Sequence, residues 1–364
     1  MTDTVLQSIP AARPVIDESD IQAAVDVMRS GMVVQGPQVK AFEEEFSEVV
    51  DGRHCVAVNS GTSALHLTLM ALGFGPGDEI ICPSFTFAAT ANSIRLVGAT
   101  PVFADIQPDT FNIDPAAVEA LVGPRTVAIM PVHLYGLPAD MRAIIDIAHR
   151  HGLAIVEDAA QAHLAAIDGL PVGSLGTAGC FSFYPTKNMH SLEGGMVTTR
   201  DAELARQLRL LRNQGMEQRY ANEVVGTNTR MTDVAAAVGR NQLRRLQGWT
   251  EQRRANADVL SAGITAAQTP VVPEGYLHSY HQYTVRSPER DALQARLAEQ
   301  QIGSATYYPT PVHRLRPFLT EAGTPDPRWE LPETERAALE ALSLPVFPTL
   351  TAEELERIIA AVNA

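Results

Sequence analysis

The stretch Phe181-Ser182-Phe183-Tyr184-Pro185-Thr186-Lys187-Asn188 follows Glu157-Asp158-Ala159-Ala160-Gln161 by about one strand and a loop. The run Leu153 to Val156 is short and continuously apolar, which is typical of a buried strand, and two acids close it. Open α/β sheets bind ligands at the carboxyl ends of their strands. The two stretches therefore predict a site in which a carboxylate and a lysine face one ligand.

A second signal lies nearer the N-terminus. Cys55 to Val58 is typical of a strand, and Asn59-Ser60-Gly61-Thr62-Ser63 leads into the apolar-periodic helix Ala64 to Met70. The free N–H groups and positive dipole end of such a helix form an anion site, to which Thr62 and Ser63 add hydroxyl donors. The spacing of a nucleotide P-loop is not found in this turn, which argues against an NTPase.

An amine, a carboxylate and an anion-binding turn are the three groups that pyridoxal phosphate (PLP) requires of a protein. Asp158 is the candidate partner of the pyridine nitrogen, because a carboxylate in a partly dry site favours the protonated ring. A lone Asp after a strand more often caps the next helix. Lys187 and the anion-binding turn favour the cofactor role here.

With these pieces together, the chain resembles the DegT/DnrJ/EryC1/StrS family, the sugar aminotransferases of the fold-type I PLP superfamily. The resemblance covers nearly the whole length. Its segments are Gly36-Pro37, Phe42-Glu43, Asn59 to Leu65, Gly77 to Ile81, Pro83 to Thr90, Pro131 to Gly136, Glu157 to Gln161, the lysine segment, and Gly226 to Met231.

The resemblance implies a role for each matching residue. Lys187 would form the internal aldimine and then shuttle a proton between the substrate and cofactor carbons. Phe87 would stack on the pyridine ring, Gln161 would bind the ring hydroxyl, and Ser182 would join Gly61, Thr62 and Ser63 at the phosphate. Asn228 would reach the phosphate from the partner subunit, so a homodimer with shared active sites is implied.

Several of these residues also have ordinary structural interpretations. Without the resemblance, Phe87 would count as a packing residue, and Gln161 and Ser182 as satisfied buried polar groups. His163 is a weaker alternative for the acid–base group, since a histidine beside a strand end is more often structural. His133 is expected in the wall of the site and not as a proton carrier.

The resemblance implies transfer of an amino group from glutamate or glutamine to a keto sugar. It points to Tyr184 and His313 as sugar contacts, with Tyr220 a weaker choice. The form Glu193-Gly194-Gly195 is more similar to members that act on 4-keto sugars, inososes or aminohydroxybenzoate precursors than to the Gly-Asp-Gly-Gly form of many 3-keto enzymes. A 4-keto-6-deoxy sugar linked to dTDP, UDP or GDP is the favoured acceptor. His190-Ser191-Leu192 and Leu164 depart from the usual pattern.

Two rival functions remain open. A sugar dehydratase of the same family replaces the Schiff-base lysine with histidine, and Lys187 argues against it. A non-catalytic regulator that binds DNA would need a basic face or a helix-turn-helix, and neither is visible in the sequence. An intact Asp158 and Lys187 also have little purpose in a pseudoenzyme.

The formal net charge is -14, which disfavours nucleic acid and anionic membranes as partners. An anionic substrate would need local cations, and Arg212, Arg219 and Arg230 are candidates. The three cysteines, Cys55, Cys82 and Cys180, are scattered through apolar segments, so we expect neither disulfides nor a metal site. With no signal peptide or membrane-spanning run in the sequence, we expect a cytoplasmic enzyme.

The order of elements predicts an α/β fold with a seven-stranded, mostly parallel sheet. The expected strands are 55–58, 79–82, 101–104, 126–132, 153–157, 178–183 and 196–199, and the expected helices include 62–72, 86–97, 139–151 and 201–212. A long helical segment, 232–264, should lead out of the sheet. We expect a large PLP-binding domain at 1–245, with an N-terminal helical segment. A small C-terminal α+β domain at 246–364 should contain strands at 283–285 and 304–307 and a closing helix at 352–362.

Overall fold

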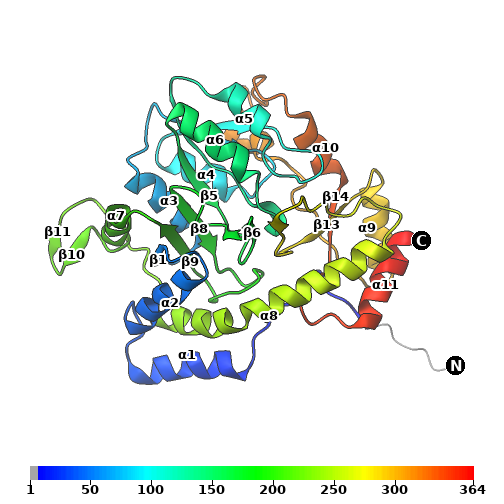
Figure 1. Cartoon of the computed structure of the whole chain (residues 1–364), viewed down its shortest axis with the longest axis horizontal. Helices are drawn as coiled ribbons and strands as arrows, with labels where there is room; N and C mark the ends of the chain where they lie inside the picture. Colours follow the sequence, from blue (N-terminus) through cyan, green and yellow to red (C-terminus); the bar gives the residue numbers. More distant parts are fainter. Residues whose placement is uncertain (1–6) are drawn as a thin grey trace.

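The computed structural model describes residues 7–364 and contains the predicted seven-stranded sheet (Figure 1). β9 is antiparallel to both of its neighbours, β1 and β8, and the other neighbouring strands pair in parallel. The α/β prediction is therefore confirmed. In spatial order the strands are β1 (His54–Val58), β9 (Gly195–Thr199), β8 (Ala178–Ser182), β5 (Ala154–Asp158), β4 (Thr126–Ile129), β2 (Glu79–Pro83) and β3 (Thr100–Ala104).

Helices cover both faces of this sheet because each strand is apolar on both sides. Ile80 and Cys82 of β2 pack with one set of helices, and Ile81 between them packs with the other. The first set is α3 (Gly61–Ala71), α4 (Ala89–Leu96) and α7 (Ala202–Arg212). The second is α2 (Pro37–Glu48), α5 (Pro115–Leu121), α6 (Met141–His151) and the start of α8 (Asp233–Gly263).

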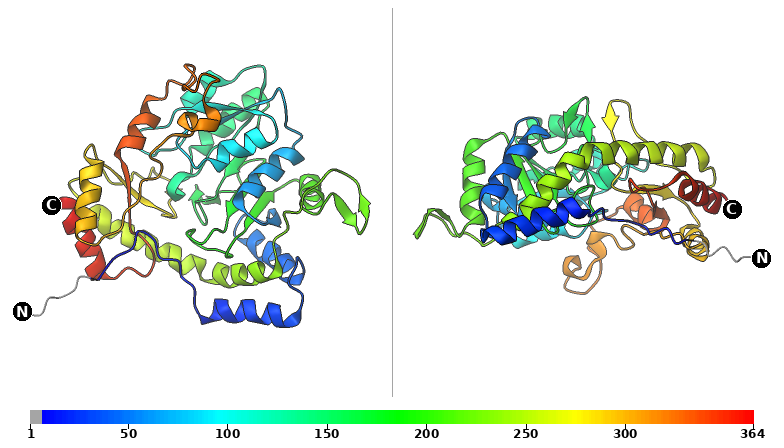
Figure 2. Two further views of the ribbon diagram at one scale, coloured as in Figure 1. Left: turned by 180° about the vertical axis from the view of Figure 1, so that it is seen from behind. Right: turned by 90° about the horizontal axis from the view of Figure 1, so that it is seen from below.

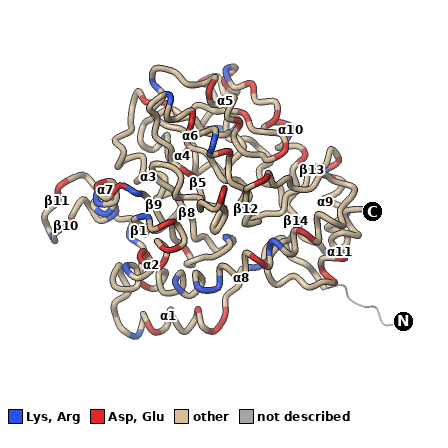
Figure 3. Tube along the Cα trace, viewed as in Figure 1, with Lys and Arg blue, Asp and Glu red and all other residues tan. Residues whose placement is uncertain are grey.

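The long helix α8 crosses the molecule, and the domain boundary expected at residue 245 falls inside it (Figures 1 and 2). It contacts α1 (Glu18–Ser30) and α2 near its start and α11 (Ala352–Asn363) near its end. Basic residues occur along α8, and acidic residues on the neighbouring α1 and α2 (Figure 3). Arg245 pairs with Asp20 of α1, and Arg240 pairs with Glu45 of α2. The helix therefore ties the N-terminal helices to the C-terminal part.

The C-terminal part is built on an antiparallel pair, β13 (Tyr283–Arg286) and β14 (Ala341–Leu344), as predicted for 283–285. The closing helix α11 is also confirmed. The strand predicted at 304–307 is wrong. Ala305 makes one bridge to Ser343, after which the chain turns so that Tyr307 and Tyr308 enter the cavity described below.

The remaining elements are two helices of the C-terminal part and several short strands and turns. They are α9 (Arg290–Glu299), α10 (Pro332–Glu340), the small sheet of β6 (Ala166–Ile167), β7 (Leu170–Pro171) and β12 (Tyr276–Leu277), the hairpin β10 (Met216–Gln218) and β11 (Ala221–Asn222), and the 3-10 turns η1 (Leu134–Gly136), η2 (Val312–Arg314) and η3 (Arg316–Phe318). No helix in residues 7–364 is both long and apolar enough to cross a membrane.

Candidate active site

A cavity of about 530 Å³ opens at the carboxyl ends of β5 and β8, where the sheet meets the C-terminal part. Most of the predicted site residues line it, although they come from separate parts of the chain. They are Gly61, Thr62, Phe87, Asp158, Gln161, Ser182, Tyr184 and Lys187.

Asp158 ends β5 and is buried in the cavity wall. Its Oδ2 accepts a hydrogen bond from Thr90 Oγ1 at 2.8 Å, and its Oδ1 accepts one from the backbone N–H of Ala160 at 3.2 Å. Burial raises the pKa of this carboxyl group, while the Thr90 and Ala160 hydrogen bonds and the charge of Lys187 lower it. A cationic partner in the cavity would favour the carboxylate further.

Lys187 lies in the turn after β8, and its backbone N–H donates to the carbonyl of Tyr184 at 2.9 Å. Burial lowers the pKa of its amine to about 8, although the charge of Asp158 opposes the shift. An amine with this pKa is partly unprotonated near neutral pH, so it can act as a nucleophile and as a base.

The first turn of α3 faces the same cavity through Gly61 and Thr62. A Cβ at residue 61 would lie 2.7 Å from Cβ of Ser182, so glycine permits the close approach of helix and strand. The N–H groups of a first helical turn have no acceptor inside the helix and can bind an anion. Ser63 differs from the prediction, because its hydroxyl contacts Asn59 Oδ1 at 2.7 Å and Ser60 Oγ at 3.0 Å and lies outside the cavity lining.

Phe87 and Gln161 lie in the cavity wall as expected. Phe87 is 60% exposed, in contrast to the fully buried Phe85, and this exposure leaves its ring available to a planar ligand. Gln161 Oε1 accepts from the backbone N–H of Tyr135 at 2.7 Å, and its Nε2 donates to Tyr308 Oη at 3.0 Å. These two bonds fix the orientation of the amide group.

The cavity wall also contains several residues that were not predicted from the sequence. Tyr307, Tyr308, His281 and Gln282 approach from the C-terminal part, and Thr86 and Glu193 from the large sheet. Tyr307 is the last residue of the stretch that was predicted as a strand, and Tyr308 follows it. A strand pattern and a paired aromatic turn look alike in sequence, so no local signal separated the two.

Three predicted residues lie elsewhere in the single chain. His313 is buried outside the cavity, where Nδ1 contacts Ser84 Oγ at 2.7 Å and Nε2 contacts Glu335 Oε1 at 2.9 Å. Tyr220 is 80% exposed in the turn of the β10–β11 hairpin, and Asn228 is exposed where it bridges to Asn213. His313 therefore has both ring nitrogens engaged by the protein, whereas Tyr220 and Asn228 face outward.

His163, the alternative acid–base group, is not placed for proton transfer, and His133 is not a proton carrier, as expected. His163 is buried between Phe181 and Phe183, and burial lowers its pKa to about 3. His133 is held at both nitrogens, because Nδ1 accepts from the N–H of Ala139 at 3.0 Å and Nε2 contacts Glu157 Oε2 at 3.0 Å. It lies beneath the site and not in the cavity wall, where the sequence had placed it.

The proposed cations are arranged differently from the sequence expectation. Arg212 is 5% exposed and is bound to the carboxylate of Glu43 and the carbonyl of Ala57. It binds the backbone of β1 and does not line the cavity. Arg230 donates to Asn213 Oδ1 at 2.7 Å, and Arg219 lies over the ring of Tyr220.

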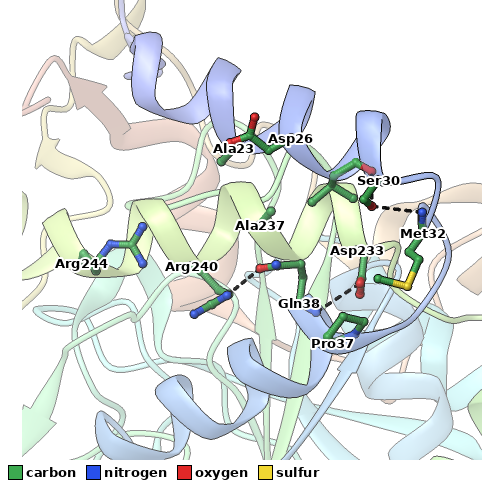
Figure 4. Close-up of a pocket in the computed structure, with 11 residues that line it drawn as sticks. Ala23, Asp26, Ser30, Met32, Pro37, Gln38, Asp233, Ala237, Arg240 and Arg244 are labelled. Atoms are coloured by element: carbon green, nitrogen blue, oxygen red, sulfur yellow. Dashed lines mark hydrogen bonds between the residues drawn. The ribbon is translucent and has the colours of Figure 1, made fainter.

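A second cavity, of about 300 Å³, lies between α1, α2 and α8 (Figure 4). The polar side chains that line it form hydrogen bonds and ion pairs with other protein groups. Asp233 accepts from the N–H groups of Gly36, Gln38 and Val39 and so caps α2, and Arg240 binds Glu45 and Gln38. This cavity therefore lacks the amine and carboxylate pair of the first one. In residues 7–364 no cluster of His, Cys, Asp and Glu is arranged to hold a metal ion.

The first cavity fits the chemistry of PLP. The α3 N-terminus, Thr62 and Ser182 could supply donors for a phosphate, and Gly61 allows α3 to approach Ser182 closely. Asp158 would hold the ring nitrogen, Gln161 the ring hydroxyl, and Lys187 the aldehyde carbon.

Comparisons with known proteins identify the family of the chain. The profile of the DegT/DnrJ/EryC1/StrS aminotransferase family matches residues 14–363. A "pleiotropic regulatory protein" of Geobacillus stearothermophilus is 46% identical over 92% of this chain and 91% of its own. The dTDP-3-amino-3,4,6-trideoxy-α-D-glucose transaminase of Streptomyces venezuelae is 44% identical over 94% and 90%. The crystal structure of S. venezuelae DesV in complex with a ketimine intermediate has a TM-score of 0.91 at 42% identity, covering 94% of this chain and 93% of DesV.

Proposed function

The chain belongs to the DegT/DnrJ/EryC1/StrS aminotransferase family, and we propose that it transfers an amino group from glutamate or glutamine to a nucleotide-linked keto sugar, with PLP held by Lys187. The observation that carries the proposal is the shared cavity of Lys187, Asp158 and the α3 N-terminus. Bound PLP would supply an electron sink for the carbon whose proton is removed. The names of the transaminase relatives support the sugar as acceptor.

The protein side chains would divide the work in this cavity. Asp158 keeps a proton on the ring nitrogen, because its charge stabilises a cation beside it. Lys187, with a pKa lowered to about 8, removes and returns the proton at the reacting carbon. Phe87, Tyr307 and Tyr308 supply aromatic surface to the cavity wall.

The carbonyl position separates two acceptors. The Glu193-Gly194-Gly195 form favours a 4-keto-6-deoxy sugar, whereas the name of the S. venezuelae relative, a 3-amino sugar transaminase, favours a 3-keto sugar. A panel of 4-keto and 3-keto sugars on dTDP, UDP and GDP, with inososes added, would be assayed for the aminated product. The acceptor with the highest kcat/KM identifies the class, and a panel without any product contradicts the proposal.

Borohydride labelling tests the lysine directly. The sequence contains two lysines, Lys40 and Lys187, and Lys40 is exposed on α2 with Glu44 as its ion-pair partner. Reduction of the PLP-loaded protein followed by peptide mass spectrometry should place the pyridoxyl group on Lys187. A label on Lys40, or no label, contradicts the site.

We also propose that Asn228 completes the phosphate site of a partner subunit. Asn228 is exposed, and apolar side chains are exposed on nearby segments, including Val224, Val225 and, in the loop after α1, Met32 to Val34. Lys187→Ala and Asn228→Ala proteins would be co-refolded and assayed, with native mass spectrometry as the check that heterodimers form. If activity returns, the two residues act from different subunits. If heterodimers form and activity does not return, the shared site is contradicted.

A further inference from the structure

Thr90 lies beneath the candidate site, at the start of α4, and its side chain is fully buried. Its hydroxyl donates to Asp158 Oδ2, while the N–H of Ala160 donates to Oδ1. Each carboxylate oxygen thus accepts one hydrogen bond from the protein. Both keep a lone-pair direction free for a partner in the cavity.

Thr86 extends this contact into a chain of hydroxyl groups. Its Oγ1 lies 3.0 Å from Thr90 Oγ1, and both side chains are at least 98% buried. The single hydroxyl proton of Thr90 is donated to Asp158, so Thr86 must be the donor to Thr90. Donation from Thr86 polarises the Thr90 O–H group and strengthens its bond to the carboxylate.

The Thr90 hydrogen bond matters because the surroundings of Asp158 disfavour its charge. Burial raises the pKa of the carboxyl group, and Thr90 is the strongest of the influences that oppose this effect. None of the other groups near Asp158 offers the carboxylate a constant positive charge. The amine of Lys187 would be bonded to the cofactor and so would no longer be a free cation. His133 is already bound to Glu157. The remaining neighbours, Cys82, Cys180 and Tyr308, are buried neutral groups.

We propose that Thr90, supported by Thr86, is a positioning residue that keeps Asp158 charged and turned toward the ring nitrogen of the cofactor. The inference rests on the proposed PLP function. It does not depend on which sugar is the acceptor. Thr90 does not touch the cofactor, so its effect must pass through Asp158.

The test uses the protein loaded with PLP that carries ¹⁵N in the ring, whose NMR shift reports the protonation of that nitrogen. Thr90→Val keeps the shape and removes the donor, whereas Thr90→Ser keeps a donor. Thr68→Val is the matched control, because Thr68 is also a buried helical threonine but bonds Ala64 O and contacts Cys180 instead.

In Thr90→Val we expect the proton shared by the ring nitrogen and Asp158 to move toward the carboxyl group, because the carboxylate loses one charge-assisted hydrogen bond. The ¹⁵N titration should then show less proton on the ring nitrogen, with the ratio of the nitrogen-protonated to the carboxyl-protonated form lower by about tenfold. kcat at neutral pH should fall about tenfold, which corresponds to about 1.4 kcal/mol. Thr90→Ser and Thr68→Val should titrate like the wild type. Thr86→Val should give a smaller shift in the same direction, and it serves as the test if Thr90→Val does not fold.

An unchanged titration in the folded Thr90→Val protein overturns the inference, as does an equal shift in Thr68→Val. A wild type that binds PLP but aminates no sugar contradicts the proposed function alone, because the NMR comparison still decides the role of Thr90. A wild type that binds no PLP overturns both.

Discussion

Strand β5 ends in two adjacent carboxylates, Glu157 and Asp158, whose surroundings are opposite in kind. Glu157 is fully buried and accepts four hydrogen bonds, from His133 Nε2 at 3.0 Å and from the N–H groups of Gly173, Leu175 and Gly176 at 2.8, 2.9 and 2.7 Å. Asp158 accepts two and faces the cavity. The protein satisfies one acid completely and leaves part of the other available to a ligand.

The difference follows from the geometry of a strand. Successive side chains point to opposite faces, so two neighbouring acids enter different environments. On one face the loop 173–176 wraps around Glu157 and makes it part of the structure. On the other face the carboxyl end of the sheet leaves Asp158 beside Lys187 and the α3 N-terminus. A residue's chemistry here is set by its face as much as by its type.

The largest expected effect comes from removing the charge on the cavity side. Asp158→Asn keeps the size of the side chain but cannot hold a proton on the ring nitrogen, so transamination should fall on the order of a thousandfold or more. The melting temperature should change little. Steady-state kinetics and circular dichroism provide the two measurements, and near-normal turnover would remove Asp158 from the mechanism.

The matching change on the other face should damage stability more than chemistry. In Glu157→Gln an amide –NH₂ replaces one oxygen and meets at least two of the four donors, which leaves buried N–H groups without an acceptor. We expect a loss of about 3–5 kcal/mol in the free energy of unfolding, measured in urea, as for breaking a buried charged network. The folded fraction should retain turnover within a few fold. If Glu157→Gln instead abolished turnover in fully folded protein, the contrast between the two faces would fail.

The smallest expected effect is on the pH dependence of PLP binding to Lys187, which should differ between the Asp158 and Glu157 variants. Only the unprotonated amine can bind an aldehyde, so PLP uptake by the apoprotein should rise with pH and level off above about 8. The charge of Asp158 raises the pKa of Lys187, so Asp158→Asn should move this midpoint to lower pH. Glu157→Gln should leave it unchanged. Stopped-flow absorbance across pH 6–10 at about one-unit steps checks both expectations. Equal midpoints in all three proteins would show that the two charges do not couple.

Local pattern explains why much of the site could be predicted. Asp158, Lys187, Gly61 and Thr62 each follow a recognisable apolar strand or begin a periodic helix, and the ends of parallel strands gather at one edge. The seven strands and the long helix 233–263 were visible for the same reason.

Other residues could not be placed from local pattern, because their position depends on chain far away in sequence. Tyr308 reaches Gln161 across 147 positions, and Thr90 reaches Asp158 across 68. The local sequence around His313 does not show whether its side chain contacts a sugar or, as observed, Ser84 and Glu335. Arg212 was expected near an anionic substrate, but it forms an ion pair with Glu43 because α2 packs beside it.

The sequence by itself therefore determined the family and the sheet and predicted the groups proposed to hold PLP, because these depend on periodicity and on motifs of adjacent residues. Only the tertiary structure decided which buried polar groups are satisfied and which remain available. That distinction arises from hydrogen bonds between distant segments. It separates the structural acid Glu157 from the site acid Asp158, and it brings Thr90 and Tyr308 into the site.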